Sequence, residues 1–136
     1  MKMCFGTTLA LSLFSAQGAD QPSVDLSKLP PASGKTGLNY ATDIKPIFEQ
    51  SCIKCHGPEK SKGKLRLDSL DGALKGGEDG KVILPGNSAG SMLVHNVAQA
   101  GKPDDYMPPP RNKANIPPLT KEQIGLIRAW IDQGAK

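Results

Sequence analysis

The chain has 136 residues, with seventeen Lys and Arg against thirteen Asp and Glu and a formal net charge of +4 at pH 7. This length suits one domain with a tail or leader to spare, and the small basic excess does not fit a nucleic-acid-binding protein. Glycine and proline are frequent and aromatic residues are few, so the core must be thin, and thin cores usually depend on a disulfide, a metal or a cofactor.

Residues 1–19 have the pattern of a secretory signal peptide. Lys2 precedes a mostly apolar run over 5–16, and small residues suited to cleavage follow at Gly18 and Ala19. The run is shorter than a membrane span. We therefore expect a periplasmic or secreted protein, without stable membrane insertion unless the leader stays uncleaved. Cys4 precedes the apolar run, which argues against a lipoprotein.

Residues 20–39 have the Pro, Ser, Gly and Lys content of a flexible linker, to which we assign no fold. The domain proper is expected over residues 40–136. It begins with a helix capped by Thr42 or Asp43 that runs towards Cys52. The sequence CIKCH therefore comes at the end of a helix.

The middle of the domain is less regular. The pieces KLRLD and KVILPG flank a Gly-rich stretch, which predicts either a short β-hairpin or an irregular loop. A short helix with apolar Leu93, Val94 and Val97 then follows a cap at Asn87 or Ser88.

The last third holds a proline-rich loop and the clearest helix. Closely spaced prolines in GKPDDYMPPPRNKANIPP prevent both helix and central strand, so Met107 lies in a stiff loop. Thr120 and Gln123 have the spacing of a capping box, and an apolar stripe continues to a stop at Gly134.

Two thiols and an imidazole occur together at Cys52, Cys55 and His56. This CxxCH spacing is typical of the attachment site for c-type haem. The two sulfurs bond the vinyl-derived carbons along one edge of the porphyrin, and the next side chain, His56, reaches the iron as proximal ligand.

Three other interpretations of the motif are weaker. A redox-active dithiol would start a helix, where the helix dipole lowers the thiol pKa, but here a helix precedes it. A zinc site would need four ligands, and His95 is the only other histidine. A disulfide between Cys52 and Cys55 would close too small a loop to stabilise much. Such a zinc or disulfide module would be colourless.

A six-coordinate iron needs a second axial ligand. Met107 is favoured, because it lies on a stiff loop far along the chain from His56. His95 is the second candidate. Met92, on the same short helix as His95, fits core packing better. The ring nitrogen of His56 that does not bind the iron should donate its N–H to a backbone carbonyl. We expect this acceptor to be the carbonyl of Pro85.

Five segments in this order resemble a known family: CIKCHGPEK, KLRLDS, VILPGN, YMPPP and LTKEQIGLIRAWIDQGA. Together they are similar to the class I monohaem cytochrome c domain of the planctomycete type, over about residues 40–136. The resemblance implies an all-α cytochrome c fold, with three main helices around one covalently bound haem and the first and last helices crossing. It also implies thioether bonds at Cys52 and Cys55, with His56 and Met107 as axial ligands of the iron.

We therefore expect an exported, monomeric electron carrier that is not itself an enzyme and has no catalytic residues. The alternative is a haem enzyme subunit or sensor with an open distal position, which requires that Met107 not bind. Redox proteins are the expected partners. A cationic cluster near the motif is either a solvated loop or a positive ring that attracts an acidic partner; it comprises Lys54, Lys60, Lys62, Lys64 and Arg66.

Overall fold

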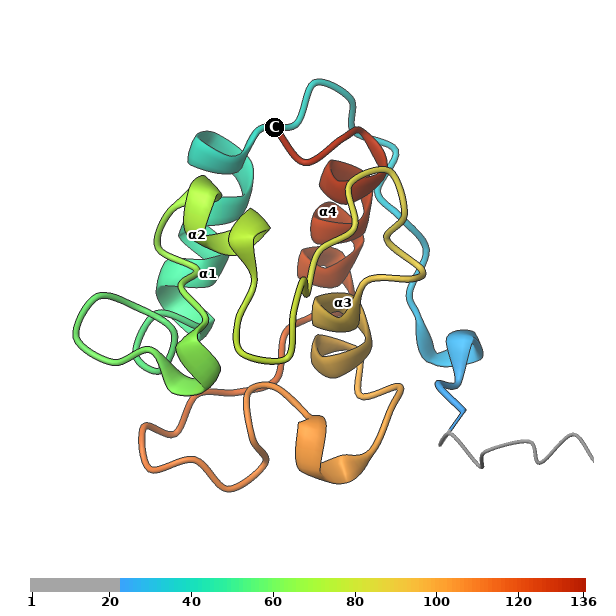
Figure 1. The fold of residues 1–136 in the computed structure, drawn as a ribbon. Coiled ribbons are helices and arrows are strands. Elements are labelled where there is room, and N and C mark those ends of the chain that lie inside the picture. Colours follow the sequence, from blue (N-terminus) through green and yellow to red (C-terminus); the bar gives the residue numbers. More distant parts are fainter. Residues whose placement is uncertain (1–22) are drawn as a thin grey trace, which may run out of the picture.

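The computed structural model describes residues 23–136, and every regular element in this range is helical (Figure 1). The α-helices are α1 (Lys45–Ser51), α2 (Leu70–Lys75), α3 (Met92–Val97) and α4 (Lys121–Asp132). A π-helical turn, η2 (Tyr40–Ile44), leads into α1, and single 3-10 turns form η1 (Leu26–Lys28), η3 (Lys62–Lys64) and η4 (Pro103–Asp105). The all-α class is confirmed for this range, with four α-helices rather than three. The predicted signal peptide, residues 1–19, lies outside it. None of the helices within 23–136 has the length and apolar character needed to cross a membrane.

The first helix begins earlier than predicted. Its cap is Asn39, whose Oδ1 accepts a hydrogen bond from the backbone N of Thr42 at 3.0 Å, while Asp43 Oδ2 accepts one from the N of Asn39 at 3.0 Å. The assignment of the cap to Thr42 or Asp43 was therefore wrong, because the π-helical turn adds residues before α1. As predicted, the helix ends at Cys52, which is the C-cap of α1.

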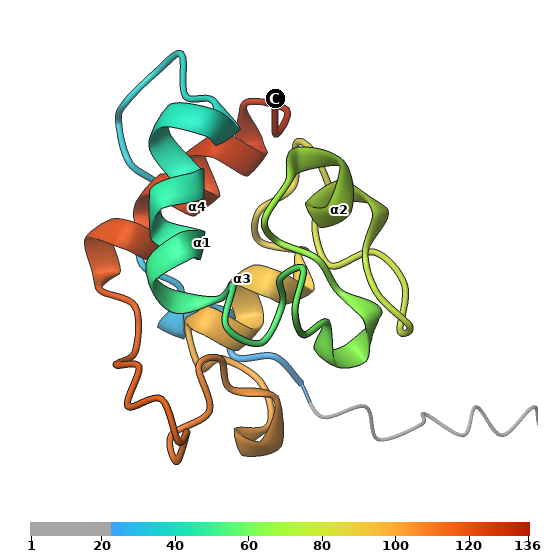
Figure 2. The ribbon, with the colours of Figure 1, turned by 90° about the vertical axis from the view of Figure 1, so that its left-hand side faces the viewer.

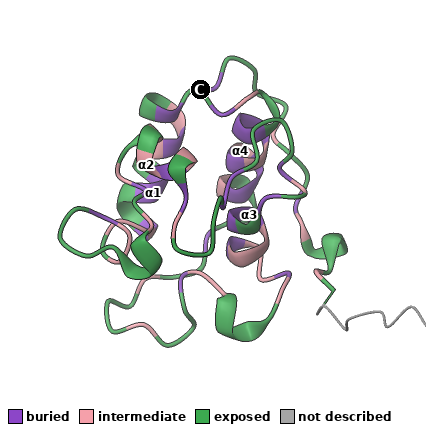
Figure 3. Ribbon diagram, in the orientation of Figure 1, coloured by how far each residue is buried: buried purple, intermediate pink, exposed green. Residues whose placement is uncertain are grey.

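The core lies where the first helix meets α4. The rings of Phe48 and Trp130, both fully buried, pack edge to face with centroids 6.4 Å apart, and Tyr40 completes the aromatic group. The turn η2, which continues into α1, contacts α4, and α4 also contacts α3 (Figure 2). Buried residues of α1, α3 and α4 make up much of the interior (Figure 3). Edge-to-face aromatic contacts add to the free energy gained by burying these rings.

The capping box of α4 is confirmed. Thr120 Oγ1 accepts from the N of Gln123 at 3.2 Å, and Gln123 Oε1 accepts from the N of Thr120 at 2.9 Å. The helix ends at Asp132, and Gly134 follows with a φ of +105°, a conformation that glycine adopts without strain.

Of the two alternatives for the middle of the domain, the β-hairpin does not form. Residues 23–136 contain no strand, only isolated bridges that pair His56 with Ser61 and Gly77 with Gly80. Between KLRLD and KVILPG the chain forms α2, where Ser69 Oγ accepts from the N of Gly72 at 3.1 Å. A side-chain cap therefore starts a helix in a stretch where the glycines suggested a turn.

The helix α3 starts later than predicted, with Ser91 at its N-cap. Ser88 is buried, and its N and Oγ instead donate to the carboxylate of Asp132 at 2.8 and 3.0 Å. Asn87 Oδ1 accepts from the N of Gly90 at 2.9 Å. The two predicted caps thus form the turn before α3, and Ser88 joins that turn to α4.

Residues 23–39 lie against the domain instead of forming a free linker. The backbone N of Ser33 donates to the carbonyl of Gly125 at 2.9 Å, and an Nη of Arg128 donates to the carbonyl of Pro30. Gln133 Oε1 accepts from the N of Leu38 at 3.2 Å. The prolines here have no N–H to satisfy, and the bonds to α4 fix the segment as a strap over that helix. We call residues 23–39 the strap.

Candidate cofactor site

The backbone after α1 brings the two cysteines onto one turn. The N atoms of Cys55 and His56 both donate to the carbonyl of Cys52, at 3.1 and 2.9 Å. Gly57 follows, and a Cβ at that position would collide with the carbonyl of Ile53. The N of Lys62 donates to the carbonyl of Cys55 at 2.8 Å and closes the loop. Glycine is therefore required for the tight return of the chain after His56.

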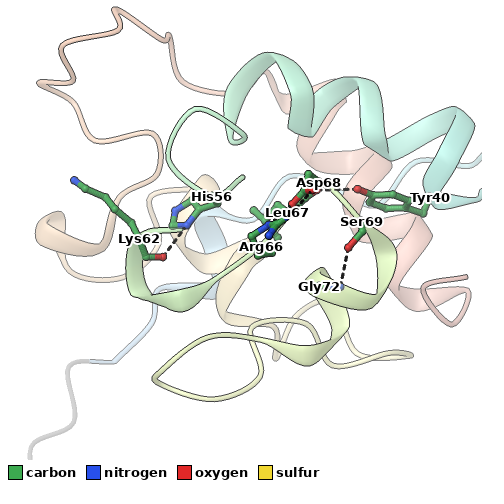
Figure 4. Close-up of polar contacts among 8 residues, drawn as sticks. All are labelled: Tyr40, His56, Lys62, Arg66, Leu67, Asp68, Ser69 and Gly72. Carbon is green, nitrogen blue, oxygen red and sulfur yellow. Dashed lines mark hydrogen bonds and ion pairs between the residues drawn. The ribbon is translucent and has the colours of Figure 1, made fainter. Parts of the chain in front are cut away.

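His56 is oriented by a backbone carbonyl. Its Nδ1 lies 3.1 Å from the carbonyl oxygen of Lys62 (Figure 4), and its own carbonyl accepts from the N of Leu67 at 2.8 Å. A carbonyl on Nδ1 requires the proton there and leaves Nε2 with a lone pair for a metal. The acceptor is thus Lys62, not Pro85, because the chain returns over His56 immediately after the motif.

Burial shifts the pKa of His56 and the pKa of Cys52. It lowers the pKa of His56 below its usual value, partly offset by the bond to Lys62, so the neutral ring is favoured at pH 7. Burial also raises the pKa of Cys52 to about 12, with the nearby Cys55 adding to the shift. Cys52 and Cys55 are both free thiols.

A cavity of about 610 Å³ lies beside the motif, between the Cys-Cys-His turn and the proline-rich loop. Cys52, Cys55 and His56 line it together with Met107 and the neighbouring prolines. A second cavity of about 250 Å³ shares Cys55, His56 and Met107 with the first. His56 and Met107 therefore border both spaces, and the larger one has a size typical for small-molecule sites.

Met107 is fixed by neighbours on both sides. Its backbone N donates to the carbonyl of Asn96, in α3, at 3.1 Å. Beyond the prolines, Asn112 Oδ1 accepts from the N of Ile116 at 2.8 Å, and Asn112 Nδ2 donates to the carbonyls of Pro109 and Ile116, both at 2.9 Å. Sequence reasoning missed Asn112; an asparagine two residues after a run of prolines is the signal that could have identified it, because asparagine often bonds to nearby backbone in turns.

The other two candidate ligands, His95 and Met92, do not border both cavities. His95 Nε2 is 2.6 Å from the carbonyl of Ala89, and His95 lines neither cavity. Met92 lines the smaller cavity only. In the part of the chain that the structure describes, no three His, Cys, Asp or Glu side chains gather as a metal site. Of the sequence candidates, only Met107 lies on both cavities with His56.

The predicted cationic cluster divides into two parts. Arg66 pairs with Asp68, at 2.6 Å between Nε and Oδ1, and like Lys64 it does not line the larger cavity (Figure 4). Lys54, Lys60 and Lys62 do line it, and they are joined there by Arg111 and Lys113 from the proline-rich loop, which the sequence pattern did not connect with them.

The residues present fit a haem. Cys52, Cys55, His56 and Met107 would hold such a group, because all four line the larger cavity and the proton on Nδ1 of His56 leaves Nε2 free to bind a metal. An all-helical domain in which a CxxCH turn and a methionine line one cavity is typical of haem-binding cytochromes c.

The comparison with known families agrees with this class. Residues 52–111 match the family described as Planctomycete cytochrome C, so this part of the chain is similar to that family. The matched range contains the CxxCH motif, Met107 and Arg111. No curated protein matches the sequence, and no solved structure does.

Proposed function

We propose that this protein is an exported c-type cytochrome that carries single electrons through one covalently attached haem. The observation that carries the proposal is that Met107 lies at the same two cavities as His56, although the residues are far apart in the chain. The leader at residues 1–19 supports a periplasmic or secreted location. Haem bound here supplies an iron that alternates between ferric and ferrous states.

Cys52 and Cys55 attach the group. Both thiols would hold the haem through thioether bonds, each formed by addition of the thiol S–H across a vinyl group. The fixed turn after α1 then holds both sulfurs on one edge of the site.

His56 and Met107, which line the same two cavities, would hold the iron. His56 Nδ1 keeps its proton on the Lys62 carbonyl, which orients Nε2 towards the metal. The thioether of Met107 is neutral and stabilises the lower iron charge, so the reduction potential is expected to be high for this class. Asn96 and Asn112 restrain the loop, so Met107 needs little reorganisation when the iron changes charge.

Replacing Met107 with Ala tests the ligation. The oxidised native protein should show the weak far-red thioether-to-iron band, and Met107→Ala should lose it and fall in potential. Met92→Ala is the matched control, since Met92 lines the smaller cavity without bordering the larger one. An unchanged band in Met107→Ala would remove Met107 from the site. Ready binding of CO by the native protein would instead favour a haem enzyme subunit or sensor with an open distal position.

A further inference from the structure

The helix α3 ends in a turn that a residue with a side chain adopts only with strain. The N of Gln99 donates to the carbonyl of Asn96 at 3.3 Å, and the N of Ala100 donates to the carbonyl of His95 at 2.9 Å. These two bonds form a Schellman motif, in which Gln99 takes the left-handed position with a φ of +54°. Glycine is usual at this position, because a Cβ is strained there. The turn is therefore stabilised by any contact from another segment that holds Gln99 in place.

The N-terminal end of the strap supplies such contacts. The backbone N of Asp25 donates to the carbonyl of Ala100 at 2.8 Å, and Lys28 Nζ donates to the carbonyl of Gln99 at 3.4 Å. Both donors are held by the turn η1, because Asp25 caps it: Asp25 Oδ1 accepts from the N and the Oγ of Ser27, at 3.1 and 2.5 Å. The strap thus binds the two carbonyls that directly follow α3, where a lysine side chain is a favourable donor.

The same turn holds the loop that carries Met107. The carbonyl of Asn96 accepts from the N of Met107 at 3.1 Å as well as from the N of Gln99. Within residues 101–106 the backbone hydrogen bonds are local to the turn η4, so the bond to Asn96 is the backbone link from Met107 back to α3. A change at Gln99 would move the Asn96 carbonyl and, with it, the backbone of Met107. Three segments that are distant in sequence therefore meet at the end of α3: the strap, the helix itself and the loop with Met107.

We propose that the strap positions Met107: Asp25 and Lys28 hold the left-handed turn at Gln99, and that turn holds the Asn96 carbonyl to which the Met107 backbone is bound. Asp25 and Lys28 line neither of the two cavities beside His56, so they are positioning residues that act through the turn. The role of this positioning in iron ligation rests on the proposed function. The coupling between the strap and Met107 is a property of the chain alone.

The test compares Asp25→Pro with Asp25→Ala. Both variants lose the carboxylate that caps η1, but only Asp25→Pro also loses the backbone N–H that binds the Ala100 carbonyl. The φ of Asp25 is −82°, close to the value that proline imposes, so the substitution does not require a new backbone conformation. In the purified, exported protein, the Met107 amide should exchange its hydrogen about threefold to tenfold faster in Asp25→Pro than in Asp25→Ala, the ratio that one lost hydrogen bond produces.

The amide of Ile127, in the middle of α4, separates positioning from overall stability. Its exchange rate, measured by NMR in the same samples, should be equal in the two Asp25 variants, because positioning acts on a local opening. A second variant, Lys28→Met, removes Nζ and should speed exchange at Met107 relative to the native protein, again without an effect at Ile127. Equal Met107 rates in Asp25→Pro and Asp25→Ala would overturn the proposal. So would an equal acceleration at Ile127, because the strap would then contribute to global stability only.

A spectroscopic measurement extends the test to ligation. In haem-loaded, oxidised protein, Asp25→Pro should lower the intensity of the far-red thioether-to-iron band relative to Asp25→Ala, since a less restrained Met107 spends less time at the metal. Faster exchange at Met107 with an unchanged band would overturn the role of the strap in ligation. Failure of the proposed function is seen separately: a protein without covalent haem shows no haem spectrum, whereas the exchange rate of the Met107 amide still tests the coupling to the strap.

Discussion

His56 is held by the carbonyl oxygen of Lys62, which lies 3.1 Å from the ring Nδ1. The next residue, Gly63, has a φ of +61°, inside the left-handed region, and its carbonyl accepts from the N of Glu78 at 2.8 Å. The left-handed turn directs the Lys62 carbonyl back towards the imidazole. The orientation of the histidine therefore depends on a glycine outside the CxxCH motif.

Replacing Gly63 with Ala should loosen this arrangement. An L-residue in the left-handed region costs about 1–2 kcal/mol, so we expect the free energy of unfolding to fall by about that amount. The His56 Nδ1 proton resonance should also shift or broaden as the Lys62 carbonyl moves. Chemical denaturation and proton NMR measure the two effects.

The control is Gly34→Ala, at a position without positive φ where a Cβ would meet no atom within 4 Å. It should leave both the stability and the resonance nearly unchanged. If Gly63→Ala behaves like the control, the left-handed turn does not orient His56.

Gly125 lies in the middle of α4, where glycine is normally unfavourable. A Cβ at this position would come within 2.9 Å of the carbonyl oxygen of Pro31, in the strap. Gly125→Ala should therefore displace the strap, break the hydrogen bond from Ser33, and lower the stability of the full chain despite the better helix propensity of alanine.

Deletion of residues 20–34 should reverse the sign of this effect. With the part of the strap that faces Gly125 removed, Gly125→Ala should stabilise the domain by about 1 kcal/mol, the usual propensity difference in a helix. Thermal or denaturant unfolding gives the stability of the full chain and of the deletion variant, each with and without Gly125→Ala. These four values form a double-mutant cycle. The same sign in both backgrounds would show that the strap does not explain the glycine.

Tyr40 should make stability fall at high pH. Its hydroxyl donates to the carbonyl of Leu67 at 2.8 Å (Figure 4), and burial, with a smaller effect of the Asp68 charge, raises its pKa to about 12. An unfolded tyrosine has a pKa of about 10. The unfolded chain thus loses this proton first, and the native state loses about 1 kcal/mol of relative stability by pH 11.

Tyr40→Phe isolates this contribution. At pH 7 the variant should be less stable by about 1–3 kcal/mol, because the Leu67 carbonyl is left without its partner, and the deficit should shrink between pH 10 and 12. Tyr106→Phe is the control, since its hydroxyl makes no hydrogen bond within residues 23–136. A pH-independent deficit in Tyr40→Phe would contradict the assignment.

Local patterns in the sequence predicted those features that depend on neighbouring residues. The CxxCH turn at the end of a helix, the stiff loop with Met107 and the Thr120–Gln123 capping box all follow from short spacings or from proline chemistry. The helix α2 escaped prediction because its glycines concealed the cap at Ser69.

Contacts between distant segments could not be predicted in this way. The strap was taken for a linker because its partners lie in α4: Arg128 donates to the Pro30 carbonyl, and the Gly125 carbonyl accepts from the N of Ser33. No local pattern connects these residues with the prolines. For the same reason, sequence proximity placed Arg66 in the cationic cluster and omitted Arg111. Only the fold shows which charges share one opening.

Acid–organic extraction of the purified, exported protein tests the central claim most directly. After expression with a c-type maturation system, the visible spectrum of the denatured chain is recorded before and after extraction, beside that of Cys52→Ala, Cys55→Ala. Haem colour that stays with the native chain, and is absent from the double variant, is the predicted result. Haem that extracts completely, or never appears in the native protein, would contradict covalent attachment through Cys52 and Cys55.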